Sequence, residues 1–134
     1  MSDLAWHFVN DKLRDGSPIP ADNEWLHYDG KPVMCKSGLH ASRNPFDALN
    51  YAPGSVLCRV RVQKIEDEWD DKLVARSRMI LQRRDISQEL RKFARDCALD
   101  VIHLWDAPQI VTDYLRTGDK SKRVAAQDAA QDAA

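Results

Sequence analysis

Two histidines lie in short segments whose residue types suit a binding or catalytic site. His7 is the centre of a Trp-His-Phe triplet at 6–8, and His40 is the centre of Gly-Leu-His-Ala-Ser at 38–42. Histidine titrates near neutral pH, so its ring can transfer protons or hydrogen-bond a polar ligand. We therefore take both as candidate catalytic residues. The structural alternatives are a packed strand histidine for His7 and a turn-stabilising histidine for His40.

Hydroxyl and guanidinium groups lie near these histidines in the sequence or on the strands that follow. The candidate cofactor-binding residues are Ser42, Tyr51, Arg59, Arg76 and Arg78. The forked guanidinium of arginine matches the oxygens of a phosphate, so an arginine-bearing sheet surface could bind one. The alternatives are a local helix cap for Ser42 and a solvated sheet face for the arginines.

Familiar catalytic and metal-binding motifs are missing. The chain has no P-loop, Rossmann glycine motif, nucleophile elbow, zinc-protease motif or paired-carboxylate motif. Its three cysteines, Cys35, Cys58 and Cys97, are odd in number and form no CxxC pair. We therefore expect no metal and no disulfide framework, and a reducing cytosol as the environment.

Alternating hydrophobicity predicts the strands that position these residues. A short strand is expected at 4–9 and another at 33–35. Period-two patterns at 55–64 and 72–82 predict two half-buried strands joined by an acidic turn, so these two strands should be antiparallel neighbours. The polar segment 10–32 predicts a long loop, which is typical of functional or lid-like segments.

Capping signals predict the helices. Asn44 followed by Pro45 begins a short helix that Pro53-Gly54 ends after Ala52. Apolar residues at helical spacing predict a second helix over 86–99, and Pro108 begins a third that ends near 116.

Composition and charge set the class of protein. The chain has 134 residues, 43% hydrophobic and 31% charged, with a formal net charge of −1. We therefore expect a single α+β domain at 1–118, with a small, mainly antiparallel sheet and two or three packed helices. No signal peptide, membrane association or nucleic-acid binding is expected.

The segment 119–134 is expected to be a polar hinge followed by a tail of Ala, Gln and Asp repeats. With no bulky apolar stripe, the tail should be solvated and poorly packed. A small-residue self-association face is the alternative.

The segment from Cys35 to Val62, continued by Asp71-Lys72-Leu73-Val74, resembles a family of uncharacterised bacteriophage and prophage proteins. The shared pattern is a Cys, then Gly-Leu-His-Ala-Ser at 38–42, then Pro-x-x-Ala-Leu-x-Tyr at 45–51, then the Asp-Lys strand. The resemblance covers about residues 4–98, and the Trp-His-Phe start and Ala-rich end also fit. It implies a phage accessory protein that acts in the host cytoplasm.

The order of a His-bearing strand, a Gly-hydrophobic-His-Ala-Ser segment, a short helix and a valine-rich strand is similar to the ADP-ribosyltransferase fold. That resemblance implies NAD as cofactor, with His7 toward the nicotinamide-side ribose and His40 toward ribose or phosphate. No glutamate stands where that fold's third motif has one, because Glu66 and Glu68 lie in the acidic turn. The enzyme interpretation therefore stays open.

The alternative is a non-catalytic phage protein that binds a host protein or protein complex. An inhibitor of a host defence complex, similar in role to anti-CRISPR proteins, and a virion component both fit. Small size and a mixed charge surface are typical of this class.

Overall fold

The computed structural model describes residues 2–133 and divides the chain into two compact units, Met1–Ile86 and Ser87–Ala134. We call them the sheet unit and the helical unit and describe each by itself. The boundary differs from the expected one at 118/119, because the helix that follows the last strand packs against the next C-terminal helix.

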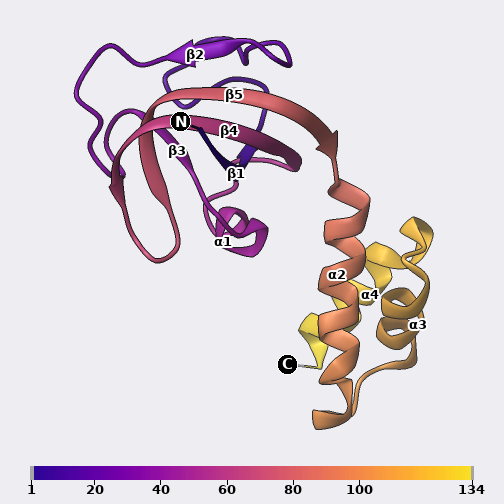
Figure 1. The fold of residues 1–134 in the computed structure, drawn as a ribbon. Helices are drawn as coiled ribbons and strands as arrows, with labels where there is room; N and C mark the ends of the chain where they lie inside the picture. The colour runs from indigo at the N-terminus through magenta and orange to yellow at the C-terminus, as the bar shows by residue number, and fades with distance from the viewer. Residues whose placement is uncertain (1, 134) are drawn as a thin grey trace. The chain divides into compact units, whose positions relative to one another are not determined.

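The three longest strands form an antiparallel sheet (Figure 1). Strand β1 (Asp3–Val9) pairs with β4 (Val56–Glu68), and β4 pairs with β5 (Leu73–Asp85). The two alternating segments are therefore neighbours, as predicted. Both strands are longer than the alternating segments that predicted them. In β4 the extra length comes from acidic residues that were expected in the turn. The α+β class with a mainly antiparallel sheet is confirmed.

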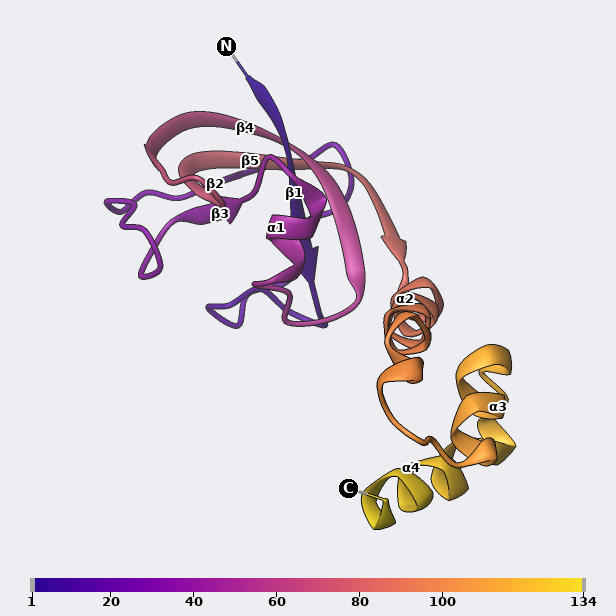
Figure 2. The same ribbon diagram turned by 90° about the horizontal axis from the view of Figure 1, so that it is seen from below.

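Two short strands pair with different parts of β5. Strand β2 (Trp25–His27) pairs with Ser77–Met79, and β3 (Leu39–Ala41) pairs with Leu73–Ala75. Just after β3, Ser42 exchanges backbone hydrogen bonds of 2.7 and 2.8 Å with Trp6 on β1. The sheet therefore curls until β3 reaches β1, as both views of the ribbon show (Figures 1 and 2).

The strand expected at 33–35 is not formed, so that prediction is wrong. Val33 instead pairs with Ser37 across a tight turn, in which the Lys36 N–H donates to the Val33 carbonyl at 2.9 Å. Cys35 takes a positive φ of 65° in this turn. Three consecutive apolar residues suit a strand or a buried turn equally well, and the Gly38 that follows favours the turn.

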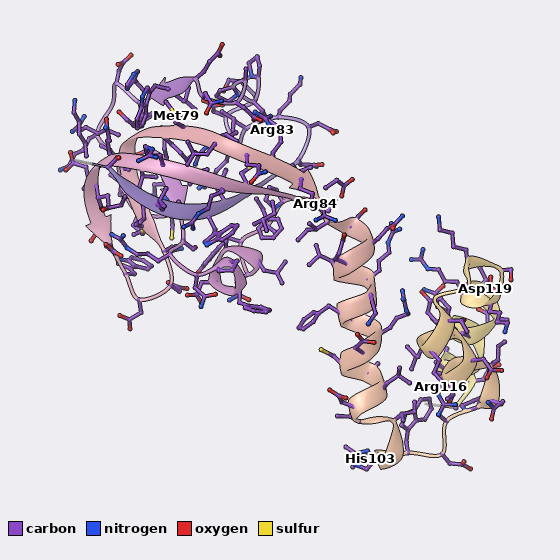
Figure 3. All side chains as sticks on the ribbon, turned by 45° about the vertical axis from the view of Figure 1, so that its right-hand side comes forward. Met79, Arg83, Arg84, His103, Arg116 and Asp119 are labelled. Atoms are coloured by element: carbon purple, nitrogen blue, oxygen red, sulfur yellow. The ribbon has the colours of Figure 1, made fainter. Side chains whose placement is uncertain are left out.

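The core of the sheet unit lies between the curled strands. Its buried members come from β1, β3, β4 and β5 and are Ala5, Val9, Ala41, Cys58, Val60, Val62, Leu73, Ala75 and Ile80. Most are small or β-branched, which lets a tightly curved sheet pack against itself. Arg83, labelled on β5 in Figure 3, fixes the long loop to the sheet by donating from Nε to Asp22 Oδ1 at 2.6 Å.

Helix α1 (Pro45–Leu49) packs against β1 and begins as its sequence predicts. Asn44 Oδ1 accepts from the Phe46 N–H at 2.8 Å. The α-helix ends three residues earlier than expected, and the chain continues to Ala52 in single turns.

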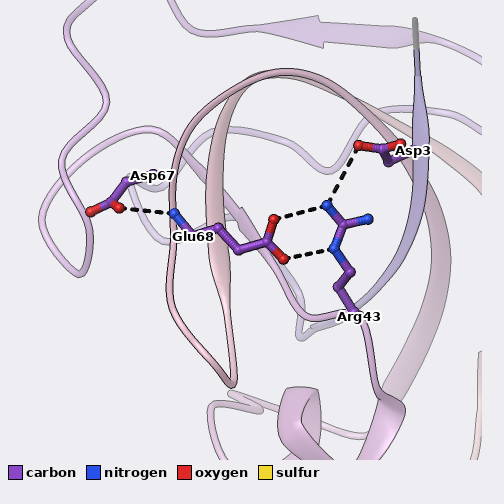
Figure 4. Close-up of polar contacts among 4 residues, drawn as sticks. All are labelled: Asp3, Arg43, Asp67 and Glu68. Atoms are coloured by element: carbon purple, nitrogen blue, oxygen red, sulfur yellow. Dashed lines mark hydrogen bonds and ion pairs between the residues drawn. The ribbon is translucent and has the colours of Figure 1, made fainter.

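Arg43, which lies just before α1, contacts residues of two strands through its side chain (Figure 4). Its Nε and Nη2 donate to the two carboxylate oxygens of Glu68 at 2.7 and 2.9 Å, and Nη2 lies 3.5 Å from Asp3 Oδ2. The Glu68 hydrogen bond raises the pKa of Arg43, and the Arg43 hydrogen bond lowers the pKa of Glu68. One side chain thus links the ends of β1 and β4 to the chain between β3 and α1.

The helical unit consists of α2 (Ser87–Asp100), α3 (Gln109–Thr117) and α4 (Arg123–Asp132), with 3-10 turns at Ile102–Leu104 and Lys120–Lys122. Gly118, with a φ of 66°, ends α3 one residue beyond the expected end near 116. Asp119, labelled in Figure 3, begins the next turn by accepting from the Ser121 N–H at 2.9 Å.

The segment expected to be a solvated tail forms helix α4, most of whose residues are exposed, and this helix makes one packing contact. Helix α4 packs against α3, and Ala126 retains only 3% of its exposed surface. Ala129 and Ala130 are half-buried on the same face. Small side chains let two helix backbones approach closely, so a face without bulky apolar groups still makes a contact.

Candidate functional site

The sheet unit contains a pocket of about 1110 Å³. Its walls come from β1, the 10–17 loop, β2, the segment 35–42, the end of α1, and single residues of the β4–β5 hairpin and β5. Elements far apart in sequence thus converge on one cavity, which is the usual form of a small-molecule site.

Five of the seven residues selected from the sequence line this pocket, and two do not. Those that line it are His7, His40, Ser42, Tyr51 and Arg78. The guanidinium of Arg59 lies 4.4 Å from the centre of the Trp6 ring. Arg76 donates from Nε to Glu66 at 2.6 Å and from Nη1 to the Gly30 carbonyl at 3.0 Å. Arg59 and Arg76 are therefore engaged by the protein itself.

Arg78 is the most unusual residue of the pocket, because its charge is buried without a carboxylate beside it. Its side chain is 5% exposed, and Nη1 donates to the His40 carbonyl at 2.6 Å. Within residues 2–133 no carboxylate forms an ion pair with it. Burial lowers the pKa of Arg78 to about 10, so the guanidinium stays charged at neutral pH. Burying an unpaired charge is unfavourable, and an anion in the pocket would offset that cost.

His7 presents a neutral ring to the pocket. Burial, followed by the charges of Arg78 and His40, holds the pKa of His7 well below its ordinary value of 6.5. Among the described residues no hydrogen bond to its ring is formed. A neutral imidazole has one donor and one acceptor, and both remain open to a ligand.

His40 is held by the backbone around it. Its Nε2 accepts from the Cys35 N–H at 2.9 Å, and its ring also hydrogen-bonds the Gly38 backbone. Burial is the largest cause that lowers the pKa of His40, with smaller contributions from the charges of Arg14, Lys72 and Arg78. With Nε2 occupied, this arrangement favours the turn-stabilising alternative for His40.

The two hydroxyl residues have different surroundings. Ser42 is buried, and its backbone joins β1 as described above. The Tyr51 hydroxyl donates to Asp71 Oδ2, which raises the pKa of Tyr51. Tyr51 is half exposed, so its ring forms part of the pocket's outer edge.

The lining is electropositive although the whole chain is slightly acidic. Its cations are Lys12, Arg14, Lys36, Lys72 and Arg78, and its carboxylates are Asp11 and Asp15. Asp15 is held by the Ser17 hydroxyl and N–H. A cleft lined mainly by one sign of charge concentrates ligands of the opposite sign, so this pocket favours anions.

Sequence reasoning missed the contact between Cys35 and Lys72 at the pocket's rim. Lys72 Nζ donates to Cys35 Sγ at 2.6 Å and lies 4.2 Å from the centre of the Tyr51 ring. It also lies 5.0 Å from the centre of the Trp69 ring. The only sequence signal was that the Cys and the Asp-Lys pair both belong to the phage-like pattern.

The described part of the chain holds no group of three or more His, Cys, Asp or Glu side chains arranged around a metal position. No helix over the same residues is both long and apolar enough to cross a bilayer.

Comparison with known proteins places the chain in a family without an assigned activity. No curated protein and no solved structure matches it. Residues 4–92 match the model of a family described as "Domain of unknown function (DUF7666)". This match covers the sheet unit from the second residue of β1 onward, including every residue that lines the pocket. The chain belongs to this family.

Proposed function

We propose that the pocket binds a phosphorylated small molecule of the nucleotide class, with NAD as the first ligand to test. The observation that carries the proposal is Arg78, which is buried, charged, without a carboxylate partner and part of the lining. A phosphate accepts paired hydrogen bonds from such a guanidinium.

The remaining lining suits the other parts of a nucleotide. Trp6, Phe8 and Tyr28 supply apolar and aromatic surface against which a base or nicotinamide ring can pack. The neutral ring of His7 supplies a donor and an acceptor for ribose hydroxyls. Lys36 and Lys72 add positive charge at the entrance for a second phosphate.

ADP-ribosyl transfer is a narrower form of this proposal. Bound NAD would supply a glycosidic bond to nicotinamide that can be cleaved. The pocket's lining contains no glutamate, and its carboxylates are Asp11 and Asp15. We therefore propose binding as the primary function and treat turnover as a measured outcome. The resemblance to phage proteins adds the proposed setting, an accessory role in the cytoplasm of an infected host.

Isothermal titration with NAD tests the binding. Arg78→Met should weaken NAD binding by about 10- to 100-fold, since a hydrogen bond to a charged group contributes about 1.5–3 kcal/mol. Arg76→Met is the matched control, because Arg76 lies on the same strand but outside the pocket, held by Glu66 and the Gly30 carbonyl, and its loss should leave the affinity unchanged. Far-UV circular dichroism verifies the fold of both variants, and nicotinamide release is measured on the same samples. No NAD binding at millimolar concentration, or equal affinity in Arg78→Met, would reject the proposal.

A second candidate function, binding of a host protein complex without catalysis, is favoured by the helical unit. Val101, Leu104 and Val124 are 51%, 74% and 66% exposed there, while Val111 and Ala126 are buried. We infer that these side chains contribute to a partner-binding surface, because covering exposed apolar groups with a partner is favourable.

Inhibition of a purified CRISPR effector complex by the full chain tests this candidate. Leu104→Glu should abolish inhibition if the helical unit binds the complex, whereas Arg78→Met should not change it. Absence of inhibition by the full chain removes this candidate in its host-defence form.

A further inference from the structure

The rim of the pocket brings a thiol and an ammonium group together from distant parts of the sequence. Lys72, on the β4–β5 turn, donates from Nζ to Cys35 Sγ at 2.6 Å in the turn before β3. Cys35 is exposed and lines the pocket, so reagents in solution can reach its sulfur. The hydrogen bond to Cys35 raises the pKa of Lys72, which keeps the amine charged at neutral pH.

The aromatic rings around Lys72 fix the ammonium in this position. Its Nζ lies 4.2 Å from the Tyr51 ring centre and 5.0 Å from the Trp69 ring centre. The Tyr51 hydroxyl is held in turn by Asp71. A cation above two ring faces is stabilised where it stands, so the charge beside Cys35 is positioned by three other side chains.

The same pocket carries independent evidence of a ligand. Arg78, 5% exposed, forms part of its wall and has one hydrogen bond, to the His40 carbonyl, although a guanidinium has five donors. Cys35 is joined to this wall directly, because its N–H donates to the ring of the same His40. Cys35 therefore lies at the edge of a site in which the buried charge of Arg78 favours the binding of an anion.

We propose that Cys35 is a thiol-modification site at the rim of the pocket, where it exchanges with low-molecular-weight disulfides. A neighbouring ammonium stabilises the thiolate, which is the reactive form of cysteine. The Cys35 sulfur attacks one sulfur of the disulfide, a new S–S bond forms, and the original S–S bond breaks. The thiol proton of Cys35 passes to water as the sulfur attacks. Cys35 is oxidised and the leaving sulfur is reduced, departing with the electron pair and taking up a proton from water.

Modification and ligand binding should interfere with each other, and this link rests on the proposed function. An adduct on Cys35 would occupy the rim and remove the partner of Lys72, one of the cations that attract an anionic ligand. A bound nucleotide would in turn cover Cys35. The other two cysteines are suitable references, since Cys58 is fully buried and Cys97 is exposed on α2. Cys97 forms no hydrogen bond or ion pair with any described residue.

Labelling of the full-length protein with iodoacetamide at pH 7, followed by peptide mass spectrometry, tests the site. Because the Lys72 ammonium lies 2.6 Å from Cys35 Sγ and Cys97 has no such neighbour among the described residues, Cys35 should label several-fold faster than Cys97. Lys72→Met should bring the Cys35 rate to within about twofold of the Cys97 rate, whereas Lys72→Arg, which keeps the cation, should preserve most of the difference. Oxidised glutathione should form its mixed disulfide on Cys35 in preference to Cys97.

Equal or slower labelling of Cys35 than of Cys97 in the wild-type protein would overturn the proposal, whether or not Lys72→Met folds. Unchanged labelling in a folded Lys72→Met would overturn it as well. Protection by NAD separates this proposal from the proposed function. Fast, Lys72-dependent labelling that NAD does not slow would retain the modification site and count against nucleotide binding.

Discussion

Gly38→Ala should destabilise the sheet unit far more than Gly16→Ala, although both glycines have positive φ. The φ values are +90° at Gly38 and +85° at Gly16, so an alanine at either position is strained by about 1–2 kcal/mol. At Gly38 the added Cβ would also lie 2.7 Å from Pro32 Cβ and 2.8 Å from Val74 Cγ2. A Cβ added at Gly16 would have no heavy atom within 4 Å apart from the adjoining residues of the chain.

The difference between the two variants isolates the packing effect at Gly38. Val74 and Pro32 are both buried, so neither neighbour has free space into which it can move. Overpacking of this kind costs about 1–3 kcal/mol, which brings the total for Gly38→Ala to about 2–5 kcal/mol. The corresponding value for Gly16→Ala is about 1–2 kcal/mol.

Urea denaturation followed by tryptophan fluorescence measures both variants. Three of the four tryptophans, Trp6, Trp25 and Trp69, lie in the sheet unit and report its unfolding. An unfolding free energy for Gly38→Ala that is equal to or higher than that of Gly16→Ala would show that the turn does not pack against β5 as described.

Acidification should destabilise the sheet unit, because burial lowers the pKa of both His7 and His40 in the folded state. As the pH falls below about 6.5, these histidines bind protons in the unfolded chain before they do so in the folded protein. The free energy of unfolding therefore decreases by up to about 1.4 kcal/mol per pH unit for each histidine. A Tm that stays constant or rises between pH 7.5 and 5.5 would contradict this. Arg43→Met should lower stability by less than about 1 kcal/mol, since its ion pair is exposed, and 1 M NaCl should reduce the difference from wild type in urea titrations. Gly118→Ala should destabilise the helical unit by at least about 1–2 kcal/mol, because φ is +66° there and the new Cβ would meet the Arg95 guanidinium. Thermal unfolding followed by far-UV circular dichroism measures this loss, and an unchanged melting curve would mean that α3 ends differently.

The parts of the fold predicted from sequence are those specified by local signals. The alternation over 55–64 and 72–82 predicted β4 and β5, and Asn44 with Pro45 predicted the start of α1. Strand β2 was missed because its three residues lie in a polar segment and are held by pairing with β5, fifty residues away in the case of His27 and Ser77. Such pairing leaves no periodic pattern of its own.

The candidate site shows the same division between local and long-range information. Trp-His-Phe and Gly-Leu-His-Ala-Ser identified two segments that line one pocket. Nothing local distinguishes Arg78 from Arg76, because both lie on β5 two residues apart. Their difference comes from neighbours: Glu66 and Gly30 bind Arg76, whereas no carboxylate in the described residues pairs with Arg78.

A crystal structure of the protein grown with millimolar NAD or ADP-ribose tests the central claim most directly. We predict that a phosphate of the ligand lies about 2.7–2.9 Å from the guanidinium nitrogens of Arg78, with the rest of the molecule against β1 and the 35–42 segment. A pocket without ligand density at saturating concentration, or a ligand whose phosphates face away from Arg78, would contradict the account.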